Sequence, residues 1–397
     1  MQAVKFLLIA SILSIIPGQL IRLPLLSLSG ALTLTDIFVF LTNAVFFLYF
    51  LTVKKKLKLH PRIFIPASLF TLSAGLSTIL ALNKFSSSEV LASSLFLVRF
   101  ILYFSQAIIA ANIIKKSEIR SWIKLIILTV VVYLILGIIQ LIVFPDLTFL
   151  ASYGWDPHQM RIVSTFLDPN FSGALVSMML AITLAMFLFG FGRVYLFLSA
   201  FAIIGIILTY SRSSYLNLIM IIATLGMFKS PKLFFTAIII FMIIFSQISR
   251  VRQRIIGALT LDETAQARVE SWKNAKTIFQ DNLLFGVGFN TYRYAQAQYG
   301  LFSPDDPLGG HSGGGADSSF LLVAATCGIF GLVFFFGLLF SIFKIYLQDI
   351  SLNYLHLASL SSFLGLLVHT QFVNSFFFPQ IMLILWFMLG LNLANDN

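Results

Sequence analysis

The residues of this chain with the clearest capacity for chemistry are arginines in polar connections on one predicted face of a membrane. Four of them are Arg161, Arg212, Arg268 and Arg293. Guanidinium groups stay charged at neutral pH and bind phosphate oxygens in pairs. Few carboxylates accompany them, so the set suits an anionic partner such as a diphosphate. The cluster Arg250–Arg254 on the same face is as readily interpreted as solvated surface charge.

One long polar stretch, residues 250–317, interrupts an otherwise apolar chain. Apolar residues recur at three- and four-residue spacing over residues 264–279, which predicts an amphipathic helix at the lipid surface. Proline, aspartate and glycine in residues 303–316 predict a gate. His311 and Asp317 close this segment, and either side chain can accept a proton.

The composition indicates that the helices that position these residues lie in lipid. Of 397 residues, 59% are hydrophobic and 10% are charged, and a soluble domain could not bury so much apolar surface. The single cysteine, Cys327, excludes an internal disulfide and a cysteine-based metal cluster. Five scattered histidines without a metal-binding motif argue against zinc. The net charge of +11 is better explained by cytoplasmic loops and anionic lipid than by nucleic acid.

Hydropathy predicts an all-α polytopic protein, since a bilayer core of roughly 30 Å needs about 20 apolar residues per helix. We predict about twelve transmembrane helices, centred on residues 4–20, 31–53, 63–82, 89–113, 122–144, 171–191, 193–210, 213–228, 233–249, 318–343, 355–374 and 376–394. The first is expected to be retained rather than cleaved, because Pro17 interrupts it and no small-residue cleavage site follows.

Basic residues between the spans set the predicted orientation. Lysines and arginines follow spans two, four, six, eight and ten, which places those connections and both termini in the cytoplasm. The chain is then one integral membrane domain, residues 1–397, with N-in and C-in topology. Residues 145–170 form a first external loop, and residues 250–317 form a long external loop between helices nine and ten.

Several other polar residues have a structural interpretation beside a functional one. Arg99 within span four must have a protein partner, and a structural role is favoured. His369 is expected to be a satisfied interior residue. Asp168 and Asn170 precede span six, and a capping role is favoured for both of them, since Asn170 can cap the helix. The Gly-x-Gly of residues 286–288 is weak support for phosphate binding, because no nucleotide-binding context surrounds it.

Four local patterns occur in order on the predicted outer face. They are Arg161 with STFLDPNFSG, Arg212 in TYSRSSYL, Arg268-Val-Glu-Ser-Trp272 followed by LLFGVGFNTY, and Asp317-Ser-Ser-Phe-Leu followed by Gly328-Ile-Phe-Gly331. Together they resemble the O-antigen ligase and Wzy-type O-antigen polymerase superfamily of bacterial membrane glycosyltransferases, over most of the chain. Leu283 stands where that family often has proline.

The last pattern departs from the ligases in one residue. Their motif begins with a histidine taken to be the catalytic base, and here Asp317 occupies that position, while Ser318, Gly328 and Gly331 fit. His311 lies six residues earlier, out of register. The resemblance therefore implies a polymerase rather than a ligase, with Asp317 as candidate base and His311 as the alternative. Asp317 could equally be the N-cap of span ten.

The resemblance implies transfer of a glycan from undecaprenyl diphosphate to a sugar hydroxyl of an acceptor, without cofactor or metal. Arg161, Arg212 and, less directly, Arg268 and Arg293 would bind the diphosphate and stabilise its growing charge. The expected location is the bacterial cytoplasmic (inner) membrane, with the active site on its external face.

The expected partners are the lipid-linked oligosaccharide, the acceptor glycan and membrane lipid, with a chain-length regulator as a further candidate and no nucleic acid. An O-antigen ligase that attaches finished glycan to a lipid A-core or other acceptor is the nearest alternative. A polysaccharide transporter or flippase is a second alternative, although its polar residues should line the membrane midplane.

Overall fold

Capping residues in the sequence set the ends of many helices in the computed structural model, which describes residues 1–24, 31–53, 57–302 and 314–396. Asp168 accepts hydrogen bonds from the backbone N–H groups of Asn170 (2.6 Å) and Phe171 (3.0 Å), and Pro169 follows it at the first helical position. The cap is therefore Asp168, and the prediction that Asn170 caps this helix is wrong.

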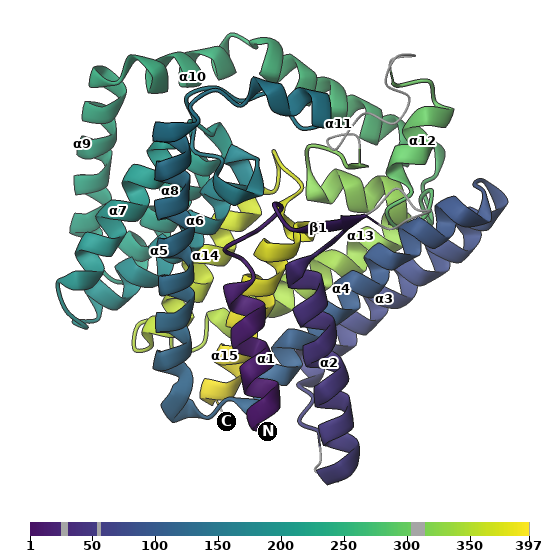
Figure 1. Ribbon diagram of the computed structural model, residues 1–397, viewed down its shortest axis with the longest axis horizontal. Helices are drawn as coiled ribbons and strands as arrows, with labels where there is room; N and C mark the ends of the chain where they lie inside the picture. The colour runs from purple at the N-terminus through teal and green to yellow at the C-terminus, as the bar shows by residue number, and fades with distance from the viewer. Residues whose placement is uncertain (25–30, 54–56, 303–313, 397) are drawn as a thin grey trace.

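The described residues form fifteen α-helices, several 3-10 turns and one small hairpin (Figure 1). The helices are α1 Gln2–Leu13, α2 Leu34–Val53, α3 Pro61–Leu80, α4 Ser87–Ile113, α5 Ile119–Val143, α6 Pro169–Leu188, α7 Val194–Leu208, α8 Arg212–Phe228, α9 Pro231–Gln247, α10 Ser249–Leu259, α11 Glu263–Asp281, α12 Tyr292–Gln298, α13 Ser319–Tyr346, α14 Tyr354–His369 and α15 Pro379–Asp396. The antiparallel strands are β1 Arg22–Pro24 and β2 Ala31–Thr33.

The all-α architecture is confirmed, and each of the twelve predicted spans overlaps one helix, α1 to α9 or α13 to α15. Six helical segments in the described part of the chain are long and apolar enough to cross a membrane, at residues 34–53, 61–83, 87–113, 116–143, 169–188 and 319–346. Several shorter apolar helices accompany them. The chain is a multi-pass membrane protein, and the count of twelve crossings stays a prediction.

Burial separates an outer layer of helices from a central one. Large apolar side chains such as Phe47, Leu72 and Ile142 are 61 to 73% exposed on the outer helices, which suits contact with lipid rather than water. Helices α6 and α15 are instead buried on nearly every side. A helix that is apolar all round belongs in the interior of a bundle.

Helix α15 carries buried polar side chains that form hydrogen bonds with its neighbours. Gln19 donates to Gln380 (3.3 Å), and Asn392 donates to the hydroxyl of Ser359 (2.7 Å). The helix packs mainly along α4, which precedes it in the sequence by more than 200 residues. Hydrogen bonding inside the bundle thus compensates for polar groups that lipid could not satisfy.

Helix α13 is broken at Gly328, whose φ of 66° and ψ of −164° are almost restricted to glycine. The turn of residues 283–288 fills the break and takes over its backbone hydrogen bonds. Val287 donates to the carbonyl of Ala325 (3.0 Å), Gly288 donates to Thr326 (2.9 Å) and Ile329 donates to Leu283 (2.8 Å). The Gly-x-Gly turn therefore has a packing role against α13.

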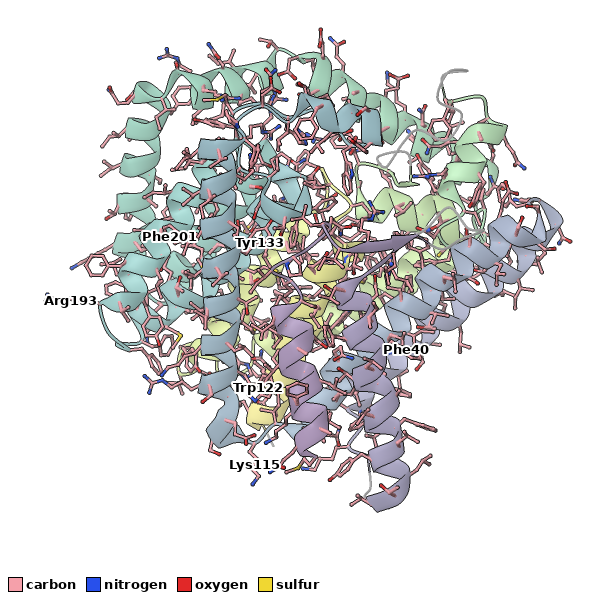
Figure 2. The ribbon with its side chains drawn as sticks, viewed as in Figure 1. Phe40, Lys115, Trp122, Tyr133, Arg193 and Phe201 are labelled. Carbon is pink, nitrogen blue, oxygen red and sulfur yellow. The ribbon has the colours of Figure 1, made fainter. Side chains whose placement is uncertain are left out.

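The long polar stretch contains three helices, α10, α11 and α12, of which only the region of α11 was expected to be helical. Helices α10 and α11 cross the end of the molecule opposite the two termini (Figure 1). The amphipathic pattern is confirmed as a helix, and part of its apolar side, Ala275 and Ile278, is buried against protein rather than facing lipid. Lys115 and Arg193, two cations of the predicted cytoplasmic loops, lie away from that end (Figure 2).

Candidate active site

A cavity of about 1530 Å³ opens beneath α10 and α11, and almost all of the predicted site residues line it. They are Arg161, Arg212, Arg268, Arg293 and Asp317. His311 and most of the predicted gate at residues 303–316 lie outside the described residues. The structure thus brings together side chains from three separate segments of the sequence.

Backbone carbonyls, rather than carboxylates, hold one group of these guanidinium groups, which we name the arginine cluster: Arg161, Arg250 and Arg254. Arg161 donates to the carbonyls of Thr209 (2.8 Å) and Tyr210 (3.2 Å). Arg254 also donates to Tyr210 (3.3 Å). Tyr210 adopts a positive φ of 49°, a backbone conformation that is uncommon for residues other than glycine. The position of its carbonyl, which both arginines share, depends on this turn.

Arg250 completes the arginine cluster. It donates to the carbonyls of Met160 (2.8 Å) and Gln159 (2.7 Å), and its guanidinium carbon lies 4.4 Å from the centre of the Tyr210 ring. Carbonyl oxygens orient a guanidinium group without cancelling its charge. Burial, together with neighbouring Arg254, lowers the pKa of Arg161 to about 10, so it remains a cation at neutral pH.

Arg212 lies at the cavity wall but is already paired. It forms an ion pair with Asp262, also donates to Thr264 (3.2 Å), and its Nε donates to the carbonyl of Arg254 (2.5 Å). The hydrogen bond from Arg212 holds the pKa of Asp262 at about 2. Arg212 thus joins the start of α8 to α10 and α11, and its predicted contact with substrate remains a prediction.

Asp317 enters the cavity wall just before α13 begins. Its backbone N–H donates to the hydroxyl of Ser271 (3.0 Å), and its carbonyl accepts a hydrogen bond from Trp272 (2.9 Å), so α11 fixes its backbone. The N-cap of α13 is Ser318, which accepts from Leu321 (3.4 Å). The alternative that Asp317 is the N-cap is therefore wrong, and its carboxylate is not used for capping.

The electrostatic surroundings of Asp317 favour a carboxyl group that can take up a proton. Burial raises its pKa, the positive charge of Arg268 opposes that rise, and Asp156 and Asp168 add to it. Arg268 is itself partly desolvated, and its Nε is buried without a hydrogen-bond partner among the described residues. The carboxylate of Asp317 is therefore a stronger base than that of an exposed aspartate, and Arg268 limits the increase.

Asp156, His158 and Asp168 form a cluster in the cavity wall that the sequence reasoning missed, although the motif WDPH precedes Arg161 by few residues. Their potential ligand atoms lie within 4.8 Å of one another, a spacing that could hold a metal ion. Burial, with the charges of Arg161 and Arg254, lowers the pKa of His158 to about 4. The same positive charge disfavours a cation, so we assign no metal to these residues.

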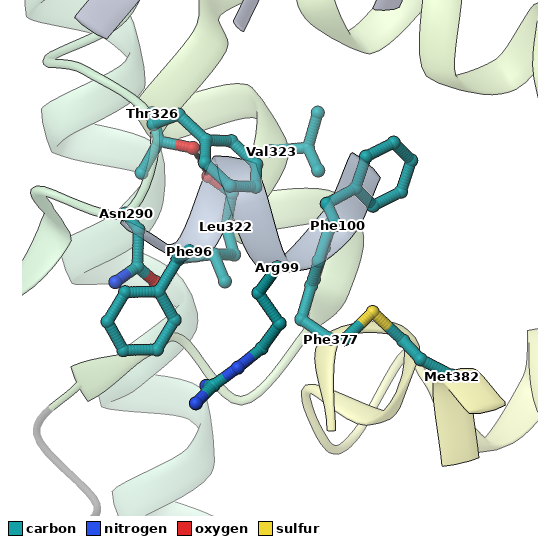
Figure 3. Close-up of a pocket in the computed structure, with 10 residues that line it drawn as sticks. Phe96, Arg99, Phe100, Asn290, Leu322, Val323, Thr326, Phe377 and Met382 are labelled. Carbon is teal, nitrogen blue, oxygen red and sulfur yellow. Dashed lines mark hydrogen bonds between the residues drawn. The ribbon is translucent and has the colours of Figure 1, made fainter. Parts of the chain in front are cut away.

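Arg99 also lines the cavity, and its partner is Asp36. Its Nε lies 2.8 Å from Asp36, and its Nη2 donates to the carbonyl of Ala31 (3.0 Å). Figure 3 shows its side chain beside Phe96 and Asn290. The favoured structural role is supported by this ion pair, but Arg99 also lines the cavity.

His369 is a buried residue with partners on both ring nitrogens, as expected. Its Nε2 lies 3.2 Å from the hydroxyl of Ser213, and its Nδ1 lies 2.7 Å from that of Ser375. Ser211, beside this network, donates to Asn170 (2.7 Å) in the cavity wall. The network joins α8 and α14 behind the site.

Comparison with protein families gives one match: residues 197–336 match the family described as O-antigen ligase. The matched region runs from α7 into α13 and contains Arg212, Arg250, Arg254, Arg268 and Asp317. This match confirms the resemblance to the O-antigen ligase and Wzy-type polymerase superfamily over that part of the chain. No curated protein matches the chain.

Proposed function

We propose that this chain, whose residues 197–336 match the O-antigen ligase family, is a polysaccharide polymerase of a bacterial cytoplasmic membrane. It transfers a glycan from undecaprenyl diphosphate to a sugar hydroxyl of an acceptor on the external face of that membrane. The observation that carries the proposal is that a single cavity of about 1530 Å³ contains both the arginine cluster and the carboxylate of Asp317. Such a cavity has room for a sugar and a diphosphate together.

The reaction follows from the chemistry of these groups. The acceptor hydroxyl gives its proton to the Asp317 carboxylate while its oxygen forms a bond to the anomeric carbon of the donor. The bond from that carbon to the diphosphate oxygen breaks, and the electron pair leaves with the diphosphate. Arginines already held by backbone carbonyls stabilise the charge that develops there, without reorganisation during the reaction.

Arg161, Arg250 and Arg254 are the preferred diphosphate ligands, because no carboxylate in the described part of the chain forms an ion pair with them. Arg268 has a second role beside Asp317, where it favours the ionised base. Guanidinium groups can provide the positive charge that a metal ion would otherwise supply. The proposed transfer is therefore metal-independent.

Substitution of the base tests the mechanism. Asp317→Asn should lower the transfer rate by about 10²–10⁴-fold, because a positioned general base contributes that much. The measurement is polymer formation by the purified full chain in vesicles containing lipid-diphosphate-linked repeat units. Asp146→Asn is the matched control, since Asp146 is an exposed aspartate outside the cavity.

His311→Ala should have the milder effect. Wild-type yield and chain length in Asp317→Asn, with a dead His311→Ala, would show that the histidine is the base. Loss in both would mean that the histidine also contributes.

An O-antigen ligase is the second candidate, favoured by the description of the matching family. It would use the same donor site and base and would differ in its acceptor. Product analysis separates the two: loss of a polymerase leaves single repeat units, whereas loss of a ligase leaves long chains on the carrier lipid.

A further inference from the structure

The cavity has a second set of cations, which lies apart from the arginine cluster and outside the family-matched region. Arg22 in β1 and Arg99 in α4 both line the cavity. Burial and the charge of Arg99 lower the pKa of Arg22, and Asp36 opposes them. The two sets also come from different elements, since Arg250 and Arg254 lie on α10 and Arg161 lies in the connection between α5 and α6.

Both carboxylate oxygens of Asp36 have hydrogen-bond partners, among them Arg99. Besides that ion pair, its carboxylate accepts hydrogen bonds from the backbone and hydroxyl of Thr33 (both 2.8 Å) and from Tyr103 (3.0 Å). Asp36 is 7% exposed, and Arg99 keeps its Nη1 without a hydrogen bond to the described residues. One carboxylate therefore accompanies two guanidinium groups, and a net positive charge remains.

Arg22 is positioned by neighbours that leave it charged. The hairpin pairs Arg22 with Thr33, which is the residue that also donates to Asp36. Its guanidinium carbon lies 5.0 Å from the centre of the Trp155 ring. An arginine on an aromatic face keeps the edge of its guanidinium group available for a ligand. No carboxylate in the described residues forms an ion pair with Arg22.

We propose that Arg22 and Arg99 form a second anion site, which binds a phosphoryl group carried by the acceptor. The inference rests on the proposed function, because it takes the arginine cluster as the site of the donor diphosphate. The two sites then place donor and acceptor in one cavity, with Asp317 in the same cavity to accept the proton of the acceptor hydroxyl.

The position of the second site in the sequence agrees with a role in acceptor choice. Arg22, Arg99 and Trp155 all precede residue 197, where the family match begins. The donor chemistry lies mainly inside the matched region, whereas this wall lies outside it. Acceptors can therefore differ between proteins while the reaction stays the same.

The test is a steady-state measurement on the full chain in vesicles with a lipid-diphosphate-linked donor. Acceptors are a lipid-diphosphate-linked repeat unit, a phosphorylated glycolipid, and an alkyl glycoside of the same sugar without phosphate. Arg22→Gln should raise KM by about tenfold for a phosphorylated acceptor, because a charge-assisted hydrogen bond is lost. KM for the donor and for the alkyl glycoside should stay unchanged, and Arg22→Lys should give an intermediate value.

Arg252→Gln is the matched control, since Arg252 is exposed on α10 and does not line the cavity. Which of the two phosphorylated acceptors is sensitive to Arg22→Gln identifies the source of the phosphoryl group. An unchanged acceptor KM, an equal rise for the alkyl glycoside, or a rise confined to the donor would overturn the second site. A wild-type protein that transfers nothing from the lipid diphosphate would overturn the proposed function itself, and with it this inference.

Discussion

The ionisation of the Asp317 carboxylate depends on its distance from two kinds of neighbour. Burial and the carboxylates of Asp156 and Asp168 raise its pKa, whereas Arg268 lowers it. A general base must be ionised to accept a proton, so the activity should fall as the pH drops through this pKa. In the proposed reaction, the carboxylates of Asp317, Asp156 and Asp168 and the charge of Arg268 would together set the pH below which transfer slows.

Removal of the positive charge at Arg268 should shift that limit. In Arg268→Gln nothing offsets the burial of Asp317, so its pKa rises and the acid limb of kcat/KM moves to higher pH. The measurement is the pH profile of transfer by the reconstituted protein. Lys273→Gln, an exposed cation on the same helix, should leave the limb in place. A limb that stays or moves to lower pH in Arg268→Gln would separate Arg268 from the base.

At the scale of elements, the break in α13 ties the outer segments to the membrane helices. The hydroxyl of Ser77 in α3 lies 2.5 Å from the carbonyl oxygen of Phe285 and 2.6 Å from that of Thr326, so its one proton is shared between the inserted turn and the broken helix. Thr326 lies nine positions after Asp317 in the sequence. The break therefore helps to fix the first half of α13, which begins directly after Asp317 and Ser318.

Gly328→Ala should destabilise the protein. An added Cβ would overlap the carbonyl oxygen of Leu284, and the backbone conformation alone costs about 1–3 kcal/mol for other residues. The folded fraction in detergent against temperature measures the effect. Gly337→Ala in the same helix is the control: no atom lies within 4 Å of the added Cβ, so stability should be unchanged or slightly higher. Equal stability of both variants would show that the break is tolerant.

The elements could be predicted from the sequence because their signal is local. Apolar runs and caps predicted twelve of the helices, and the polarity of residues 250–317 predicted the segment above the cavity. The break at Gly328 could not be predicted, since glycine is common in membrane helices and only the turn at residues 283–288 makes it necessary. The ion pairs of Arg99 and Arg212 join residues 63 and 50 positions apart, so no local pattern indicates them.

In the candidate site, too, the residues in local motifs could be predicted and the contacts between distant residues could not. Arg161, Arg212, Arg268 and Asp317 were predicted through their motifs, and the structure places them around one cavity. For the arginines at positions 250 and 254 the sequence left solvated charge and an anion-binding role equally open, because only the fold shows their hydrogen bonds to backbone carbonyls. Asp156 and His158 were missed for a similar reason.

At the scale of the whole molecule, the predicted orientation can be measured with cysteine labels. The native Cys327 is fully buried and should give a low background. Lys276→Cys, on the exposed side of α11, should react with a membrane-impermeant maleimide in spheroplasts, whose outer membrane is removed and whose cytoplasmic membrane is intact. Arg193→Cys, between α6 and α7, should react only after permeabilisation. The reverse pattern would invert the predicted N-in and C-in topology.

The burial of α15 has a consequence for the time course of assembly. This helix occupies the centre of the bundle, yet it follows every other described helix in the sequence, and its main neighbour is α4. Contacts between segments so distant in sequence form slowly. Gln380 and Asn392 can form hydrogen bonds with Gln19, which follows α1, and with Ser359 of α14 only after α15 has packed into the bundle. The earlier helices therefore have to remain as an open, hollow bundle during synthesis, and the two walls of the cavity can take their final spacing only when α15 enters it.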